Sequence, residues 1–499
     1  MNDETGDWLN SSDSKDYFEL LRFPTVGAEK EHLRDCVQSA TWLKKWLKGI
    51  GASAELIVPQ VRSQKEEVRR DGGESSFALS VPVVYGELRG QEGATTVLLY
   101  GHYDVQPADP IGEWKTPPFE PTVQGDRIYC RGAQDDKGQV FAFLCGVREL
   151  INTESQRHRE AGDVSLPPCL GVKNINLKIV LDGQEESGSV GLFKLLEDKE
   201  FRKRLSADVM LVCDTSAAAD LRPAIVAGLR GVNHFTVTLT AANRDLHSGE
   251  YGGIAPNAAQ GMAELMASLH NADGSIAVAG FRDGIEPPSH EELAKAEESF
   301  SHCAAEDAAA ADRIEAYYAK DIGTEPCGGQ RGKTIVQRNC FEPTIELNGI
   351  HSGYGGPGSK TVIPCQAIAK ISTRLVPGQV PAKTYEAIKR HLKDHCPRGM
   401  QVELSELTGD SPAIRLPLAS PLFRLAESLL GEMDPRGAVF QWDGASIPVV
   451  AAIREASGAA PLLVGWGQPE DRIHSPNESY SVRQFLAAKE WAKKILAAF

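Results

Sequence analysis

The sequence has no apolar run near the roughly 20 residues that a membrane-spanning helix needs, and its 499 residues carry a net charge of −15. Nucleic acids and anionic membranes bind basic surfaces, so this charge argues against both kinds of partner. The opening segment MNDET is acidic and polar, which is not typical of a signal peptide. The ten cysteines include no C-x-x-C pair, and most lie in apolar runs as small thiols. We therefore expect a cytoplasmic protein.

The composition is that of an ordinary globular protein, with 41% apolar and 24% charged residues. A chain of this length exceeds one compact core, so two domains are expected. Residues 177–181 and 209–213 are short, β-branched and apolar, as is typical of interior parallel strands. Because helical patterns alternate with such strands, the sequence predicts a doubly wound, mostly parallel α/β sheet.

The pattern changes after Gly231 to strand, helix, two strands, helix and strand, which is the ferredoxin-like order. An Ala-, Glu- and Asp-rich segment, residues 273–333, interrupts it and is predicted to be helical and exposed. Residues 154–173 are predicted to form a surface insertion. The simplest architecture is a discontinuous catalytic α/β domain with an inserted α+β lid or dimerisation domain. The predicted boundaries are 1–228 and 409–499 for the catalytic domain and 229–408 for the lid.

The motif GHYDVQP, residues 101–107, closes the apolar run 96–100, which reads as a buried strand. His102 and Asp104 lie two residues apart and so share one face of extended chain. A histidine in this position could bind a metal while the neighbouring carboxylate orients its ring. The alternative is a histidine at a strand end beside a surface carboxylate.

Two adjacent aspartates stand in the motif YCRGAQDDKG, residues 129–138, before an apolar helix. They could serve as an N-cap that favours the helix dipole. The other interpretation is that one carboxylate bridges two cations while its neighbour is held by Lys137 or by the backbone.

Three further acidic or histidine motifs follow predicted strands. Residues 181–189, LDGQEESGS, carry Glu185 and Glu186, of which one could bind a metal while the other acts as a base. Asp214 follows the strand 209–213, and His474 follows the apolar run 461–466. Solvated acidic loops and a structural histidine are the alternatives.

Taken together, these motifs put two histidines and several carboxylates at the carboxyl ends of predicted parallel strands, where an open α/β sheet gathers its site. Two histidines and three carboxylates, one of them bridging, would suit a pair of Zn²⁺ ions, or Mn²⁺ or Co²⁺.

The order GHYDVQP, YCRGAQDDKG, GQEESGS, RDLHSGEYGG, KTVIP, TRLVP and HSPNE resembles the M20 family of di-zinc metallopeptidases over nearly the whole chain. The similarity is greatest to its carnosinase-like and cytosolic dipeptidase branch. It implies hydrolysis of the amide bond of dipeptides or similar small peptides by metal-activated water. It also implies two Zn²⁺ ions per subunit and a homodimer formed through the lid domain.

The resemblance implies a ligand set for the two cations. His102 and Asp214 would bind one of them, and Glu186 and His474 would bind the other. Asp135 would bridge the two.

The remaining roles implied by the resemblance divide between the two domains. Asp104 would hold the His102 ring, and Glu185 would be the general base. From the lid, His247 would reach the neighbouring subunit's site and stabilise the oxyanion. Arg374 would bind the substrate carboxylate, in a pocket lined also by Thr361, Gly444 and Ser446.

One stretch departs from the family pattern. Dipeptidases of this branch commonly carry a histidine in G-H-G-x-x-P, where this chain reads LTGDSP at residues 407–412. Carnosine itself is therefore not predicted as the substrate.

Three alternatives remain open. An N-acyl-amino-acid deacylase would use the same metal site, whereas a free-amine substrate would favour a carboxylate at the pocket rim, such as Asp410 or Glu478. A non-catalytic metal-dependent binding protein is expected to lose the base Glu185, which is present. The segment CGGQRGKT, residues 327–334, is a near miss to a phosphate-binding loop and is expected to be an ordinary loop.

Overall fold

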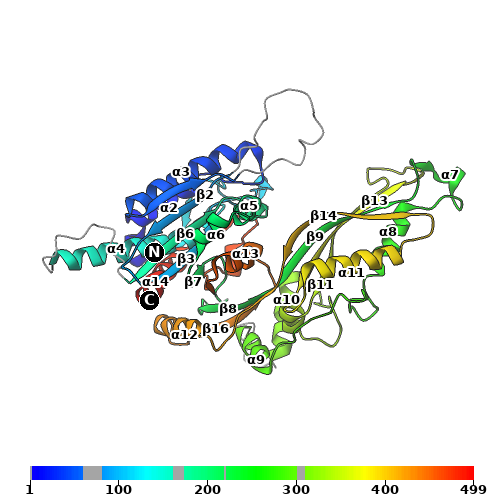
Figure 1. Cartoon of the computed structure of the whole chain (residues 1–499). Helices are drawn as coiled ribbons and strands as arrows, with labels where there is room; N and C mark the ends of the chain where they lie inside the picture. The colour runs from blue at the N-terminus through cyan, green and yellow to red at the C-terminus, as the bar shows by residue number, and fades with distance from the viewer. Residues whose placement is uncertain (1–2, 60–80, 161–173, 219–220, 301–309) are drawn as a thin grey trace. The chain divides into compact units, whose positions relative to one another are not determined.

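The computed structural model describes residues 3–59, 81–160, 174–218, 221–300 and 310–499 (Figure 1). The chain forms two compact units. The first comprises Met1–Val226, Pro417–Phe440 and Ala452–Phe499, and the second comprises Ala227–Leu416 and Gln441–Ala451. The chain thus leaves the first unit twice and returns to it twice.

A sheet with parallel central strands forms the middle of the first unit. Its order is β1-β2-β6-β3-β7-β17-β8, in which β6, β3, β7 and β17 are parallel and the other neighbours are antiparallel. The strands are β1 (Ser53–Ile57), β2 (Val83–Leu88), β3 (Thr95–His102), β6 (Ile175–Asp182), β7 (Val209–Val212), β8 (Ala224–Leu229) and β17 (Ala460–Leu463). The predicted α/β class with a mostly parallel central sheet is confirmed.

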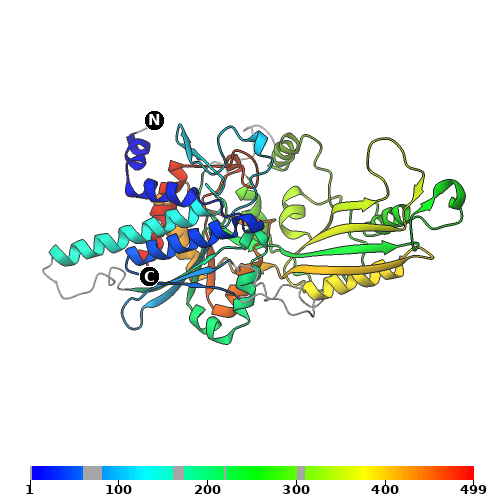
Figure 2. The same ribbon diagram turned by 90° about the horizontal axis from the view of Figure 1, so that it is seen from above.

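Helices cover both faces of this sheet, which explains why its central strands are buried almost throughout. Figures 1 and 2 show α3 and α4 on one side and α5 and α6 on the other. The helices are α1 (Asp3–Leu9), α2 (Ser12–Leu21), α3 (Leu33–Gly49), α4 (Lys137–Glu160), α5 (Val190–Leu196), α6 (Lys199–Leu205), α12 (Pro421–Met433) and α14 (Val482–Ala497). Residues 154–160 of the predicted surface insertion continue α4, and residues 161–173 lie outside the described ranges.

A small three-stranded sheet, β18-β5-β4, brings distant parts of the first unit together. Its strands are β4 (Thr122–Gln124), β5 (Arg127–Tyr129) and β18 (Ser479–Ser481). The pairing of Ser479 with Tyr129 carries the segment around His474 to the loop that holds Asp135.

The second unit contains a four-stranded antiparallel sheet of order β11-β13-β9-β14. Its elements follow the predicted ferredoxin-like order, which is confirmed. They are β9 (Gly231–Thr240), α8 (Ala258–Ala267), β11 (Thr344–Ser352), β13 (Gln366–Leu375), α11 (Pro381–Asp394) and β14 (Gln401–Ser411). Successive side chains of a strand point to opposite faces of the sheet. Val237 and Leu239 of β9 point to the face covered by the helices, where they pack in the apolar core with Leu265 of α8 and Ile388 of α11. The side chains of the intervening positions lie on the opposite face.

The predicted helical insert forms two helices within the described residues, α9 (His290–Ser299) and α10 (Ala310–Ile322), while residues 301–309 lie outside them. Ser289 begins α9 with a capping box to Glu292. The segment 327–334 consists of loop and turn residues, as expected.

Short elements complete the second unit. They are β10 (Leu246–His247), α7 (Ser248–Tyr251), β12 (Val362–Ile363), β15 (Ile414–Arg415), β16 (Val439–Asp443) at the unit boundary, and α13 (Pro448–Ser457), which runs on into the first unit. Among the described helices, none has the length and apolar character needed to cross a membrane.

Candidate metal centre

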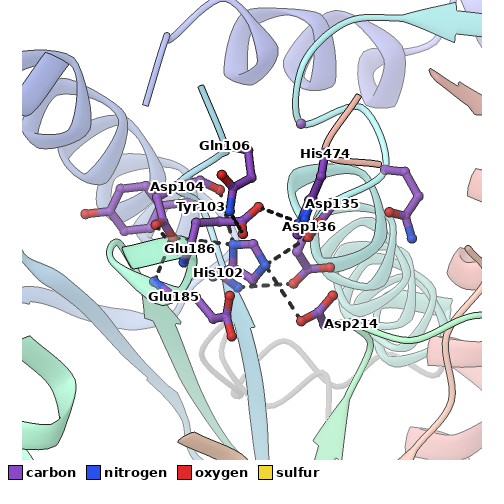
Figure 3. A network of polar contacts seen from close by, with 12 residues as sticks. His102, Tyr103, Asp104, Gln106, Asp135, Asp136, Glu185, Glu186, Asp214 and His474 are labelled. Carbon is purple, nitrogen blue, oxygen red and sulfur yellow. Dashed lines mark hydrogen bonds and ion pairs between the residues drawn. The ribbon is translucent and has the colours of Figure 1, made fainter. Parts of the chain in front are cut away.

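The carboxyl ends of the parallel strands position the predicted ligands of the first unit. His102 is the last residue of β3, Glu186 follows β6, and Asp214 follows β7. Parallel strands end at one edge of a sheet, so these side chains lie close together, as Figure 3 shows. His474 and Asp135 reach the same place from loops.

Two groups of side chains share the Asp135 carboxylate. The donor atoms of His102, Asp135 and Asp214 all lie within 4.8 Å of one another, and so do those of Asp135, Glu186 and His474. One oxygen of Asp135, Oδ1, is 3.1 Å from His102 Nε2, and the other, Oδ2, is 2.8 Å from His474 Nε2. A single carboxylate therefore faces both histidines, one with each oxygen (Figure 3).

Each histidine also has a second carboxylate nearby. Asp214 Oδ2 is 3.7 Å from His102 Nε2, and Glu186 Oε1 is 3.3 Å from His474 Nε2. Gln106, the sixth residue of GHYDVQP, donates from Nε2 to the other Glu186 oxygen at 2.7 Å. Gln106 stands within the motif GHYDVQP, but its residue type alone did not predict this contact.

The two adjacent glutamates differ in their surroundings. Glu186 belongs to the second group of donor atoms, whereas Glu185 belongs to neither group. Burial raises the pKa of the Glu185 carboxyl well above its ordinary value. The structure thus distinguishes Glu186, a candidate metal ligand, from Glu185, although their adjacent positions in the sequence did not.

Asp104 contacts both the His102 ring and the glutamate turn. Its Oδ1 is 3.4 Å from His102 Nδ1, and its carboxylate accepts the backbone N–H groups of Glu185 at 3.0 Å and Glu186 at 3.1 Å. The side chain is fully buried. Asp104 therefore fixes the orientation of the ring and the position of the turn at the same time.

The electrostatics of the centre favour bound cations. Burial, together with the neighbouring Asp135 charge, raises the pKa of Asp214 to about 7. Burial and Asp135 likewise raise the pKa of Glu186. Crowded, buried carboxylates repel one another unless positive charge lies between them. Imidazole nitrogens with carboxylate oxygens are a donor set that suits Zn²⁺, Mn²⁺ or Co²⁺, so these residues fit two divalent cations.

Glu478 supports the loop that carries Asp135. It pairs with Arg131 Nη1 at 2.7 Å, and its carboxylate accepts the N–H groups of Gly132 and Gln134 at 3.0 Å and of Asp135 at 3.1 Å. Only 1% of Glu478 is exposed. The expectation that Glu478 could stand at the pocket rim and receive a substrate amine is therefore wrong, because its oxygens are buried and occupied by the loop.

Asp136, the neighbour of Asp135, is held by the backbone. Its Oδ2 accepts the N–H of His102 at 3.1 Å. A Cβ at position 101 would lie 2.7 Å from that oxygen, which explains why glycine precedes His102. Lys137 points elsewhere and donates to the Phe23 carbonyl at 2.7 Å. Of the two partners considered from the sequence, the backbone is the one observed.

The remaining predicted site residues belong to the second unit. His247 Nε2 lies 3.4 Å from Thr361 Oγ1, and Arg374 donates to Ser446 Oγ at 2.8 Å. The Gly444 carbonyl accepts a hydrogen bond from Arg230 Nε at 2.7 Å. Asp410 is exposed on β14. Arg230, which follows the strand β8 and precedes β9, stands in no motif that marked it from the sequence.

Comparison with known proteins places this centre in a family. The model of "Peptidase family M20/M25/M40" matches residues 98–498. Cys-Gly metallodipeptidase dug1 of Schizosaccharomyces pombe is 30% identical over 415 residues, 81% of this chain and 80% of that protein. Beta-Ala-His dipeptidase of Homo sapiens is 28% identical over 421 residues, 84% of this chain and 76% of that protein.

A solved structure shares the fold over the whole chain. It is an M20 family metallo-carboxypeptidase from Sulfolobus solfataricus, with a TM-score of 0.79, 25% identity, and coverage of 97% of this chain and 98% of that chain. The family match spans the ligand groups, the glutamate turn and the second unit alike. This chain belongs to peptidase family M20/M25/M40.

Proposed function

We propose that this chain hydrolyses the peptide bond of dipeptides with the help of two divalent cations, Zn²⁺ foremost, with Mn²⁺ or Co²⁺ as substitutes. The observation that carries the proposal is the pair of ligand groups that share Asp135, with Glu185 beside them and outside both. The names of the relatives support a dipeptide as the substrate, since they are dipeptidases for Cys-Gly and Beta-Ala-His.

The first cation would be held by His102 and Asp214, the second by Glu186 and His474, and Asp135 would bridge them. When bound, such cations lower the pKa of a water molecule and polarise the scissile carbonyl.

Glu185 is the proton carrier of the proposed reaction. It takes a proton from the attacking water and gives it to the departing amine. Its buried surroundings raise its pKa well above the ordinary value, which brings proton uptake and release closer to neutral pH. Asp104 acts as a positioning residue, because it holds both the His102 ring and the backbone of Glu185.

The second unit supplies the substrate contacts. Arg374 binds the C-terminal carboxylate of the dipeptide through charge-assisted hydrogen bonds. Ser446 orients the Arg374 guanidinium, and Gly444 belongs to the same turn. Thr361 lies beside His247 at the other end of β13 and contacts the substrate together with it. His247 donates to the carbonyl oxygen as negative charge develops on it.

In this proposal the protein is a cytoplasmic homodimer that associates through the second unit, and His247 acts in the partner's site. Mixing a His247→Ala variant with a Glu185→Gln variant tests this arrangement, because mixed dimers would regain one intact site. Recovery of activity on mixing supports the trans role of His247. No recovery, together with the solution mass of a monomer, contradicts it.

The proposed function is tested by turnover of a substrate panel with metal-loaded protein. The panel contains dipeptides with free amines and matched N-acetyl amino acids. We expect cleavage of the dipeptides, measured as released amino acid. Preferential cleavage of the N-acetyl compounds would instead identify a deacylase, and binding without any turnover would identify a binding protein.

A further inference from the structure

The second unit contains a cavity of about 600 Å³ whose charged lining is mainly positive. Four arginines and two glutamates line it, namely Arg230, Arg282, Arg338, Arg374, Glu342 and Glu346. The whole chain carries a net charge of −15, so a cluster of guanidinium groups is a local exception to its composition. A concave site of this charge and size suits a small anion with more than one charged group.

The negative charge in the lining is already partly neutralised. The Glu342 carboxylate pairs with Arg282 at 2.8 Å and with Lys333 at 3.0 Å. Glu346 is exposed on β11. Arg282 is therefore committed to Glu342 and contributes little free positive charge to the cavity.

Arg230 and Arg374, by contrast, form no ion pair with any carboxylate in the described part of the chain. Arg230 donates only to carbonyl oxygens, that of Gly444 at 2.7 Å and that of Glu342 at 3.3 Å. Arg374 donates to the hydroxyl of Ser446 at 2.8 Å. Asp443 attracts both guanidinium groups from a longer distance.

The two guanidinium groups also repel each other. Burial, together with the positive charge of Arg374, lowers the pKa of Arg230 to about 10. In the sheet, Arg374 on β13 lies opposite Val232 of β9, two residues beyond Arg230. Two neighbouring, largely buried cations are costly to keep together unless an anion joins them.

The backbone around Gly444 is shaped to admit Arg230. A Cβ on Gly444 would lie 3.1 Å from Arg230 Nη2 and would collide with the Asn339 side chain. The Arg230 N–H also donates to the Ala445 carbonyl at 3.1 Å. Arg230 is thus held at fixed points beside the turn that carries Ser446, the partner of Arg374.

We infer that Arg230 and Arg374 together bind a substrate with two carboxylates, that is, a dipeptide whose C-terminal residue is aspartate or glutamate. Arg374 takes the main-chain carboxylate and Arg230 takes the side-chain carboxylate. This inference rests on the proposed function for the role of Arg374 and extends it to the choice of the C-terminal residue.

The test compares L-Ala-L-Glu with L-Ala-L-Gln, two dipeptides of nearly the same shape that differ in one charge. We expect the full-length, metal-loaded protein to show a kcat/KM at least about tenfold higher for Ala-Glu, because a charge-assisted hydrogen bond is lost with Ala-Gln. In Arg230→Met the ratio of the two kcat/KM values should fall to within about twofold. Arg230→Lys, which keeps a positive charge, should retain an intermediate ratio.

Arg282→Met is the matched control, because it removes the same charge from the same cavity at a residue already paired with Glu342. It should keep the wild-type ratio. A ratio is measured within one protein, so partial unfolding of a variant lowers both rates and leaves the comparison intact. A wild-type ratio near one, or loss of the ratio in Arg282→Met but not in Arg230→Met, would overturn the inference.

A binding measurement separates this inference from the proposed function. Titration calorimetry of both dipeptides with the Glu185→Gln variant gives their dissociation constants without turnover. Equal binding and equal hydrolysis of the two would refute the acidic preference and leave the dipeptidase intact. Tighter binding of Ala-Glu, without hydrolysis of either dipeptide by the wild-type protein, would support the acidic preference and refute the proposed dipeptidase activity.

Discussion

The two units of this chain carry polar centres of opposite sign. In the first, buried carboxylates crowd around His102 and His474, and burial together with the charge of Asp135 raises the pKa of Asp214 to about 7. In the second, Arg230 and Arg374 stand together without a carboxylate ion-pair partner among the described residues, and Arg230 has a lowered pKa. One centre has room for cations and the other for an anion. In both, the charge that would complete the site is expected to arrive with a ligand.

Metal removal is expected to have the largest effect, because it acts on the first centre alone. Treatment with a chelator should reduce dipeptide hydrolysis to background, and Zn²⁺, Mn²⁺ or Co²⁺ should restore it. Hydrolysis is followed by amino acid release and metal content by mass spectrometry. Full activity in protein shown to be free of metal would contradict the proposed centre.

The Glu185→Gln substitution sharpens the distinction between ligand and base. We expect kcat to fall by about 10²- to 10⁴-fold, the usual contribution of a general base, with metal content unchanged. Glu197→Gln, at an exposed helix end, is the control and should match the wild type. A Glu185→Gln variant that keeps most of its activity would show that the base lies elsewhere.

Arg374→Met tests the second centre. Loss of hydrogen bonds between charged groups costs about 1.5–3 kcal/mol, so KM for a dipeptide should rise about 10- to 150-fold while kcat changes less. A dipeptide amide, which has no C-terminal carboxylate, provides the internal check. The wild type should handle it poorly, and Arg374→Met should hardly distinguish it from the free acid. Equal losses on both substrates would point to a structural role.

The pH dependence of metal affinity is the most gradual of these effects. Hydrogen bonds to Asp135 and Glu186 raise the pKa of His474 to about 10, so the free protein holds a proton there at neutral pH. A cation binds the neutral imidazole and must displace that proton, so affinity should rise by at least about tenfold per unit between pH 6 and 8. Competition with a chelator at fixed ionic strength measures it. His474→Gln should lower the slope, whereas the exposed His351→Gln should leave it unchanged.

The sequence predicted the fold and the family well because both leave local patterns. The buried strands 177–181 and 209–213 read as parallel strands from their composition, and the strand-helix order after Gly231 identified the ferredoxin-like arrangement. Both strands are found, extended or trimmed by one or two residues at their ends. The apolar helix expected after YCRGAQDDKG is α4, which continues to Glu160 through polar residues that gave no sequence signal for its end.

Contacts between distant residues could not be predicted in the same way. Glu478 was considered as a rim carboxylate, whereas the structure pairs it with Arg131, 347 positions away. The ion pair of Glu478 with Arg131 depends on the folded arrangement of the chain. β18 pairs with β5, and this brings Glu478 next to the loop that carries Asp135. The roles given to the metal ligands, to His247 and to Arg374 stay predictions until the experiments above are done.

Asp104 sets a limit on how this centre could be re-engineered. One carboxylate contacts the His102 ring of the first ligand group and the backbone N–H of Glu186 in the second. A change that shifts Asp104 therefore displaces both groups together. Selectivity for two different metals would have to be introduced at Asp214 or His474, each of which belongs to one group only.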